Sequence, residues 1–196
     1  MNYSVYRTST GEILWSGACM DEDYEALHIP AGAEKAPIGS SAPTQYFCKT
    51  AGCAVDFEEP PTRFHVWDWS EQVWKPDVAG AIAELKREVD TLYAEKSQRP
   101  VVYEGHAFDA GDASRAAILS WAVCVSGGGQ LPPGFVWRDA QNFNHPADAQ
   151  FVTGLSNLLA LHTTAARTVA WSHKLAISQL TNLQALLDYQ IGTGWD

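Results

Sequence analysis

Between residues 3 and 75, short stretches in which hydrophobic and polar residues alternate with a period of two are separated by turns, which is the pattern of half-buried β-strands. Three stretches of this kind reverse direction at turn-forming residues and therefore predict β-hairpins. The predicted hairpins cover residues 3–17, 45–57 and 64–75. Pro60 and Pro61 lie between the last two, where a residue without a backbone N–H interrupts strand pairing.

The period changes after Pro76, where apolar residues recur every three or four positions and predict an amphipathic helix to about residue 98. Its apolar stripe extends over only about two heptads, which is too short for a coiled coil. The helix is therefore interpreted as a link or as a seam between copies of the chain. The stripe consists of Val78, Ile82, Leu85, Val89 and Leu92.

The pattern beyond Pro100 predicts mainly helices with short β-elements between them. We expect a β-element at 101–108, a helix at 111–125, a strand at 135–139, a loop at 142–146, a long helix at 147–176 and a last helix after Thr181. The fold class is therefore α+β: a small N-terminal β-hairpin or meander domain, then a mainly α-helical C-terminal domain with a short β-hairpin. The predicted domains are residues 1–76 for docking, 77–99 as the linking helix and 100–196 as the helical part.

Composition narrows the class of protein. The chain has 196 residues, a formal net charge of -10 and no run of Lys or Arg, so we expect no nucleic-acid binding. No apolar run approaches the roughly 20 residues that cross a bilayer, so no membrane insertion is expected. The first residues lack the basic flank and apolar core of a signal peptide, which predicts synthesis in a cytoplasm.

The four cysteines leave two interpretations open. Cys48 and Cys53 flank a predicted turn and could form a disulfide in an oxidising medium, while small half-buried thiols in a reduced compartment are the favoured interpretation. Cys19 and Cys124 are isolated in the sequence, so the set lacks the paired spacing of a zinc site.

The stretch from Phe108 to Arg115 places two aspartates, a serine and an arginine within eight residues. Its acids lack the spacing of a calcium loop, and Ser114 lacks the flanking glycines of a nucleophile elbow. Helix chemistry fits instead: Asp109 is the predicted N-cap, and Asp112 takes the place of a capping-box acid. His162 and His173 lie eleven residues apart on the predicted long helix, so no metal motif is formed there. We therefore predict no catalytic residue, no metal, no cofactor and no enzymatic activity.

Eight tryptophans are many for this length, and such rings contribute strongly to cores and to protein contacts. Mutual stacking is the favoured interpretation of Trp67, Trp69 and Trp74, with a sugar- or peptide-binding face as the alternative. The candidate interface aromatics are Trp15, Trp67, Trp69, Trp74, Trp137 and Trp195.

Three motifs in the second half occur in a characteristic order: Tyr-Glu-Gly-His-Ala-Phe-Asp at 103–109, Asp-Ala-Ser-Arg at 112–115 and Val-Trp-Arg-Asp-Ala-Gln-Asn at 136–142. A long helix rich in alanine and leucine follows them. This half resembles an uncharacterised C-terminal domain of bacteriophage tail and tail-fibre-associated proteins. The Thr-Gly-Glu-Ile hairpin at 10–13 and the Trp-Asp to Trp hairpin at 67–74 resemble the N-terminal module of phage tail-fibre and tail-fibre-assembly proteins.

The resemblance implies a structural component of a phage tail, at the baseplate or where fibres attach. Its partners would be other tail or fibre proteins, and self-association stays open. The chain would be synthesised in the host bacterial cytoplasm and located in the virion tail. The resemblance brings no catalytic residues. Two alternatives remain: a tail-fibre assembly chaperone that leaves the virion, and a carbohydrate-binding tail module.

Overall fold

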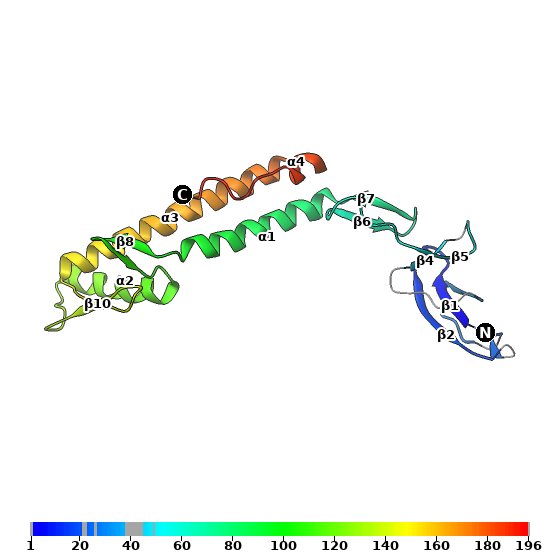
Figure 1. Ribbon diagram of the computed structural model, residues 1–196, viewed down its shortest axis with the longest axis horizontal. Helices are drawn as coiled ribbons and strands as arrows, with labels where there is room; N and C mark the ends of the chain where they lie inside the picture. Colours follow the sequence, from blue (N-terminus) through cyan, green and yellow to red (C-terminus); the bar gives the residue numbers. More distant parts are fainter. Residues whose placement is uncertain (1, 21–22, 26, 38–44, 49, 196) are drawn as a thin grey trace. The chain divides into compact units, whose positions relative to one another are not determined.

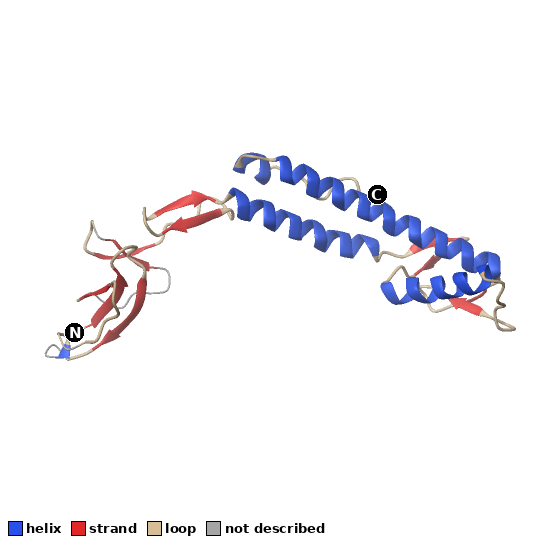
Figure 2. Ribbon diagram, turned by 180° about the vertical axis from the view of Figure 1, so that it is seen from behind, coloured by secondary structure: helices blue, strands red, loops and turns tan. Residues whose placement is uncertain are grey.

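The chain folds into two compact units, Met1–Asp77 and Val78–Asp196. The computed structural model describes residues 2–20, 23–25, 27–37, 45–48 and 50–195. Antiparallel strands build the first unit, whereas helices with two small hairpins build the second (Figure 2). The predicted α+β fold is therefore confirmed.

A three-stranded antiparallel sheet begins the first unit, with strand order β2-β1-β3. Tyr6 on the central strand stacks on Phe47 with ring centroids 3.8 Å apart, and Ala36 is buried in the same cluster. This contact packs the following hairpin onto the sheet. The strands are β1 (Asn2–Arg7), β2 (Ile13–Ala18) and β3 (Ala33–Ala36).

Two further hairpins complete the first unit. They pair β4 (Gln45–Cys48) with β5 (Cys53–Asp56), and β6 (His65–Asp68) with β7 (Val73–Pro76). All three hairpins predicted from the alternating pattern are confirmed. Cys48 lies directly opposite Cys53, and both thiols are free in this structure.

Gly11 allows the backbones of the first and second hairpins to approach closely. Its carbonyl accepts a hydrogen bond of 2.8 Å from the Phe47 N–H, and its φ is +80°. A Cβ at this position would lie 2.3 Å from the Phe47 carbonyl oxygen, so only glycine fits. Gln72, in the turn of the third hairpin, donates to the carbonyls of Thr10 and Phe47 at 3.2 and 3.1 Å. A backbone hydrogen bond and the side-chain amide of Gln72 thus join the three hairpins at one place.

The second unit contains four helices and two hairpins within its described residues. The helices are α1 (Val78–Ser97), α2 (Asp112–Ser126), α3 (Ala149–Gln179) and α4 (Leu183–Leu187). The hairpins pair β8 (Val101–Tyr103) with β9 (His106–Phe108), and β10 (Val136–Arg138) with β11 (Asn144–Pro146).

The loop predicted at 142–146 is wrong, because its second half is strand β11. Three residues, Asn-His-Pro, are too few to show an alternating pattern. Their pairing comes from the preceding turn, which returns the chain onto β10 so that Trp137 lies opposite His145.

Helices α1 and α3 run antiparallel and side by side (Figure 1). Lys174 pairs with Asp90, and further along the pair His162 Nε2 lies 3.1 Å from the Lys96 carbonyl. The helix predicted as a link at 77–99 thus packs along its length and belongs to the second unit.

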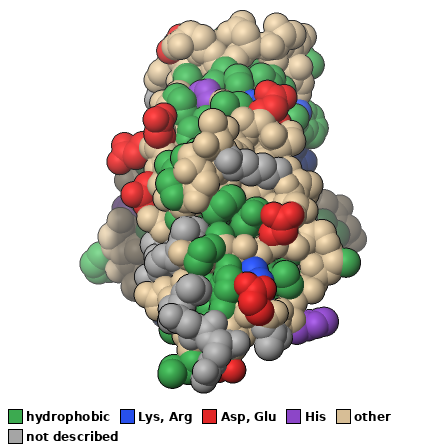
Figure 3. Space-filling model, turned by 90° about the vertical axis from the view of Figure 1, so that its right-hand side faces the viewer, with side chains coloured by type: hydrophobic (Ala, Val, Ile, Leu, Met, Phe, Trp, Pro, Cys, Tyr) green, Lys and Arg blue, Asp and Glu red, His purple; other side chains and the backbone are tan. Residues whose placement is uncertain are grey.

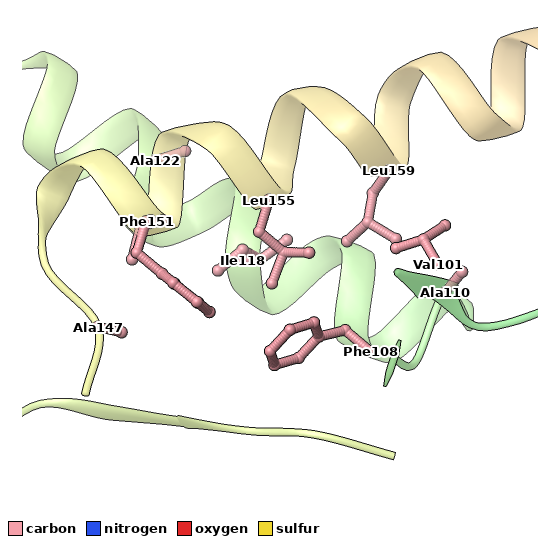
Figure 4. Packing of buried hydrophobic residues seen from close by; sticks show 10 residues of the cluster. Val101, Phe108, Ala110, Ile118, Ala122, Ala147, Phe151, Leu155 and Leu159 are labelled. Atoms are coloured by element: carbon pink, nitrogen blue, oxygen red, sulfur yellow. The ribbon is translucent and has the colours of Figure 1, made fainter. Parts of the chain in front are cut away.

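The core of the second unit lies where β9, α2 and α3 converge (Figure 4). Phe108, Ile118 and Leu155 point toward one another there and are almost completely buried. Burying an apolar side chain of this size contributes about 2 kcal/mol relative to leaving it in water. Phe151 meets Phe108 edge to face, with centroids 5.5 Å apart.

Helix α2 does not begin as the sequence predicts. Its N-cap is Gly111, which makes no side-chain cap hydrogen bond, so the prediction of Asp109 as N-cap is wrong. Asp112 is the first helical residue and pairs with Arg115, so it is not a capping-box acid either. The physical reason is Ala110: its complete burial in the core moves the start of the helix beyond Asp109.

Arg115 connects the end of α1 to the start of α2. Its Nη1 donates to the carbonyls of Ser97 and Ala110 at 2.9 and 2.8 Å. The Ser97 carbonyl is among the last four of α1, which have no partner within the helix. One guanidinium therefore satisfies backbone groups of two segments that meet at the core.

We expect Arg115→Ala to lower the free energy of unfolding by about 2 kcal/mol, because hydrogen bonds from a charged donor are lost and two carbonyls lose their partner. Urea denaturation of the purified chain measures this. Asp109→Ala is the matched control from the same stretch and should stay within about 0.5 kcal/mol of wild type. Equal losses in the two variants would contradict the role given to Arg115.

Candidate functional site

Asp139 organises the turn that joins β10 to β11. Its Oδ1 accepts hydrogen bonds from the N–H groups of Gln141 and Phe143 at 2.9 and 2.8 Å. Its own N–H donates to the Phe143 carbonyl at 3.0 Å. Asn142, with φ +68°, takes the left-handed conformation that asparagine tolerates well. Side-chain and backbone chemistry of the Trp-Arg-Asp-Ala-Gln-Asn motif thus close this turn.

The second carboxylate oxygen of Asp139 meets a histidine. His145 Nε2 lies 2.8 Å from Asp139 Oδ2, and the ring of His145 lies beside that of His106 with centroids 4.1 Å apart. Asp139 is only 4% exposed, His145 is half-buried and His106 is exposed. We call these three residues the His–Asp–His cluster; they come from β9, the β10–β11 turn and β11.

The hydrogen bonds of Asp139 set its ionisation. Burial acts to raise its pKa, but the hydrogen bonds from His145 and from the N–H groups of Phe143 and Gln141 outweigh this effect. The pKa of the Asp139 carboxyl therefore lies below its ordinary value of 3.8. A carboxylate that stays charged in a buried position can orient a histidine or bind a cation.

A hollow of about 460 Å³ adjoins the same aspartate, between the start of α2 and strand β10. Residues from all three sequence motifs of this half line the hollow. They are Asp109, Ser114, Asn142 and the Trp-Arg-Asp segment at 137–139. The lining mixes both charges with an aromatic ring. No histidine is among its lining residues.

The tryptophans predicted as interface residues in the third hairpin form an aromatic cluster within the first unit. Trp67 and Trp74 are cross-strand partners with ring centroids 5.3 Å apart, and Phe57 lies edge to face with Trp67 and Trp69. All three tryptophans are half-buried in these contacts, which is the stacking arrangement. The indole N–H of Trp67 is buried and has no hydrogen-bond partner in the described part of the chain.

The other predicted interface tryptophans differ in exposure. Trp15 on β2 is 39% exposed, whereas Trp137 is half-buried against the core of the second unit. Trp195 stacks on the buried ring of His173, and its indole N–H donates to the Ile191 carbonyl at 2.7 Å. Trp195 therefore fastens the end of the chain to α3.

The sequence interpretation missed a more exposed apolar surface on α3. Leu161, Trp171 and Leu175 are 69%, 65% and 63% exposed. Positions 161, 164, 168, 171 and 175 share one side of the helix, opposite its buried residues, and we call this face the α3 stripe. The available signal was that Leu161, Trp171 and Leu175 fall outside the apolar stripe predicted for the buried side of this helix.

The His–Asp–His cluster was also missed, for a different reason. His106 is separated from the other two residues by the whole of α2, and no short motif links them. Pairing of β8 with β9 and of β10 with β11 brings the three side chains together. Spacing along the chain gives no signal of this site.

The geometry defines an α+β protein whose helical unit carries an exposed apolar helix face and a histidine–carboxylate cluster. Residues 80–191, more than half of the chain, match the family described as Domain of unknown function (DUF4376), and the chain belongs to that family. No curated protein and no solved structure matches the chain. None of the described helices is both long and apolar enough to span a membrane.

We expect Asp139→Asn to lower stability at neutral pH, because the amide has only one acceptor oxygen and cannot face both the N–H groups of the turn and His145 with an oxygen. The folded-state pKa of Asp139 lies below 3.8, so its carboxylate stabilises the fold above about this pH and loses that contribution as the pH falls further. Urea denaturation across this range should show the difference between wild type and variant shrinking in acid. Asp109→Asn, an exposed acid nearby, is the control. A difference that stays constant with pH would contradict the prediction.

Proposed function

We propose that the chain is a structural component of a bacteriophage tail, at the baseplate or where fibres attach, and that it acts through protein–protein contacts. Two features support this proposal: the resemblance of both halves to phage tail proteins and the exposed α3 stripe. The stripe indicates how the chain would act, because large apolar side chains on a water-facing side of a helix are typical of a surface that another protein covers.

The α3 stripe is free of charge. Helix α3 has 31 residues but no acidic side chain and only two basic ones, Arg167 and Lys174, and Lys174 already pairs with Asp90 of the same chain. An exposed helix face ordinarily carries charges of both signs. On the face of the molecule in Figure 3, acidic side chains are seen at several places, in agreement with the net charge of -10.

A second copy of this chain is the occupant that fits the stripe best. Two uncharged faces can meet without repulsion, although each chain is acidic as a whole. Leu161, Trp171 and Leu175 lie on one side of α3, so the same face of a second copy can cover them in a self-complementary contact. A patch that pairs with itself is the usual interface between two identical subunits related by a two-fold axis.

We expect the wild-type chain to form an oligomer and Trp171→Glu to shift it toward the monomer, because a carboxylate at the centre of the stripe would have to be buried. Light scattering after gel filtration over a range of concentrations measures the mass, and circular dichroism checks that the helices remain. A shift of at least about tenfold in dissociation constant is expected.

Val102→Glu is the matched control, since Val102 is an equally exposed apolar residue, on β8 and outside the stripe. It should leave the mass unchanged. A wild-type chain that stays monomeric, or an oligomer that Trp171→Glu leaves intact, would remove the second copy as occupant.

The phage-tail assignment is tested separately. If the chain is part of the tail, mass spectrometry of washed virions should detect it in a fixed ratio to the other tail proteins. Complete absence from the particles would contradict this. If co-expression of an absent chain also raised the yield of soluble fibre, the protein would be an assembly chaperone instead.

A further inference from the structure

We propose that His106, Asp139 and His145 bind a divalent transition-metal ion, with Zn²⁺ as the preferred ion. The site is independent of the proposed function and uses no residue of the α3 stripe. Two imidazoles and one carboxylate are a donor set that zinc takes from proteins. Calcium and magnesium prefer all-oxygen sites, so the two ring nitrogens disfavour them.

The separation of the donor atoms suits one small ion. One ligand atom from each residue lies within 4.8 Å of the others. Ligand atoms on one tetrahedral zinc lie about 3.3 Å apart, given bonds of about 2.0–2.1 Å. Asp139 Oδ2 and His145 Nε2, now 2.8 Å apart, need to separate only slightly for an ion to enter between them. The exposed ring of His106 lies beside the ring of His145, with centroids 4.1 Å apart.

The carboxylate is held in position before any ion binds. Asp139 Oδ1 is occupied by two backbone N–H groups, which leave Oδ2 to face His145. Groups that fix a ligand in this way raise metal affinity, because less freedom is lost on binding. His145 is likewise restrained by strand pairing and by an edge contact with Phe108, with centroids 5.6 Å apart.

The ion would join the two hairpins of the second unit. His106 lies on β9, while Asp139 and His145 flank the β10–β11 turn. One direct backbone hydrogen bond already links these segments, from the Ala140 N–H to the Ala107 carbonyl at 2.8 Å. A metal bound to all three side chains would cross-link the same place and stabilise the folded state in proportion to its occupancy. The exposed side of His106 leaves the fourth position to water.

The test is titration of the full, reduced chain with Zn²⁺ and with Co²⁺. We expect saturation at one ion per chain and a rise in melting temperature with Zn²⁺. The visible spectrum of bound Co²⁺ should show tetrahedral nitrogen and oxygen ligands. His106→Gln removes an exposed ligand with little risk to folding and should weaken Zn²⁺ binding by about tenfold or more. His28→Gln, a histidine of the first unit, is the matched control and should bind as wild type does.

Three outcomes would overturn the proposal. The first is no binding of either ion at micromolar concentration. The second is equal Zn²⁺ affinity of wild type and His106→Gln. The third is strong near-ultraviolet charge-transfer absorption with Co²⁺, which reports thiolate ligands and would assign the ion to the free cysteines. Zn²⁺ binding that Asp139→Asn and His106→Gln both weaken, with no thiolate band, would support it.

Discussion

The second unit depends on one constraint: the long helix α3 must bury one side over nearly its whole length. Buried residues recur along it from Phe151 to Ile177. No single neighbour is long enough to cover this side, so helices α1 and α2 and the hairpin strand β8 each cover part of it. Near the end of the helix, the tail covers it through His173, which meets the Tyr189 hydroxyl and the Thr193 carbonyl at 2.9 Å each. The arrangement of these elements follows from the buried side of α3, which they cover together.

Because several elements pack on one face of α3, some of their ends lie at the boundary of the core. Polar side chains form hydrogen bonds with the backbone groups at these ends. Arg115 does so between α1 and α2, and Asp139 does so for the turn between β10 and β11. Arg115 belongs to the Asp-Ala-Ser-Arg motif, and Asp139 belongs to the Val-Trp-Arg-Asp-Ala-Gln-Asn motif. Their first role is to satisfy backbone groups that burial would otherwise leave without partners. The His–Asp–His cluster arises from the second of these roles, since the turn fixes the carboxylate beside His145.

Much of the fold could be predicted because its signals are local. Alternation with glycine at turns gave the three hairpins of the first unit, and apolar spacing gave α1, α2 and α3. The start of α2 could not be predicted, because Asp109 is a good cap by residue type while the burial of Ala110 is a tertiary effect. Strand β11 and the His–Asp–His cluster could not be predicted either. Both depend on pairing between segments, which leaves no period in the sequence.

The distribution of charge along the chain bears on the interpretation of the α3 stripe. Residues 1–77 contain twelve acids and five bases, so most of the net charge of -10 lies in the β-rich unit. The helical unit is closer to neutral, and α3 itself has no acid. Electrostatic repulsion between copies is therefore weak at the exposed apolar residues of α3. A helix used only as internal scaffold would gain solubility from Glu or Lys at positions 161, 171 and 175, at almost no cost in helix propensity. Leucine and tryptophan at these positions make sense if water is excluded from them by a neighbouring chain.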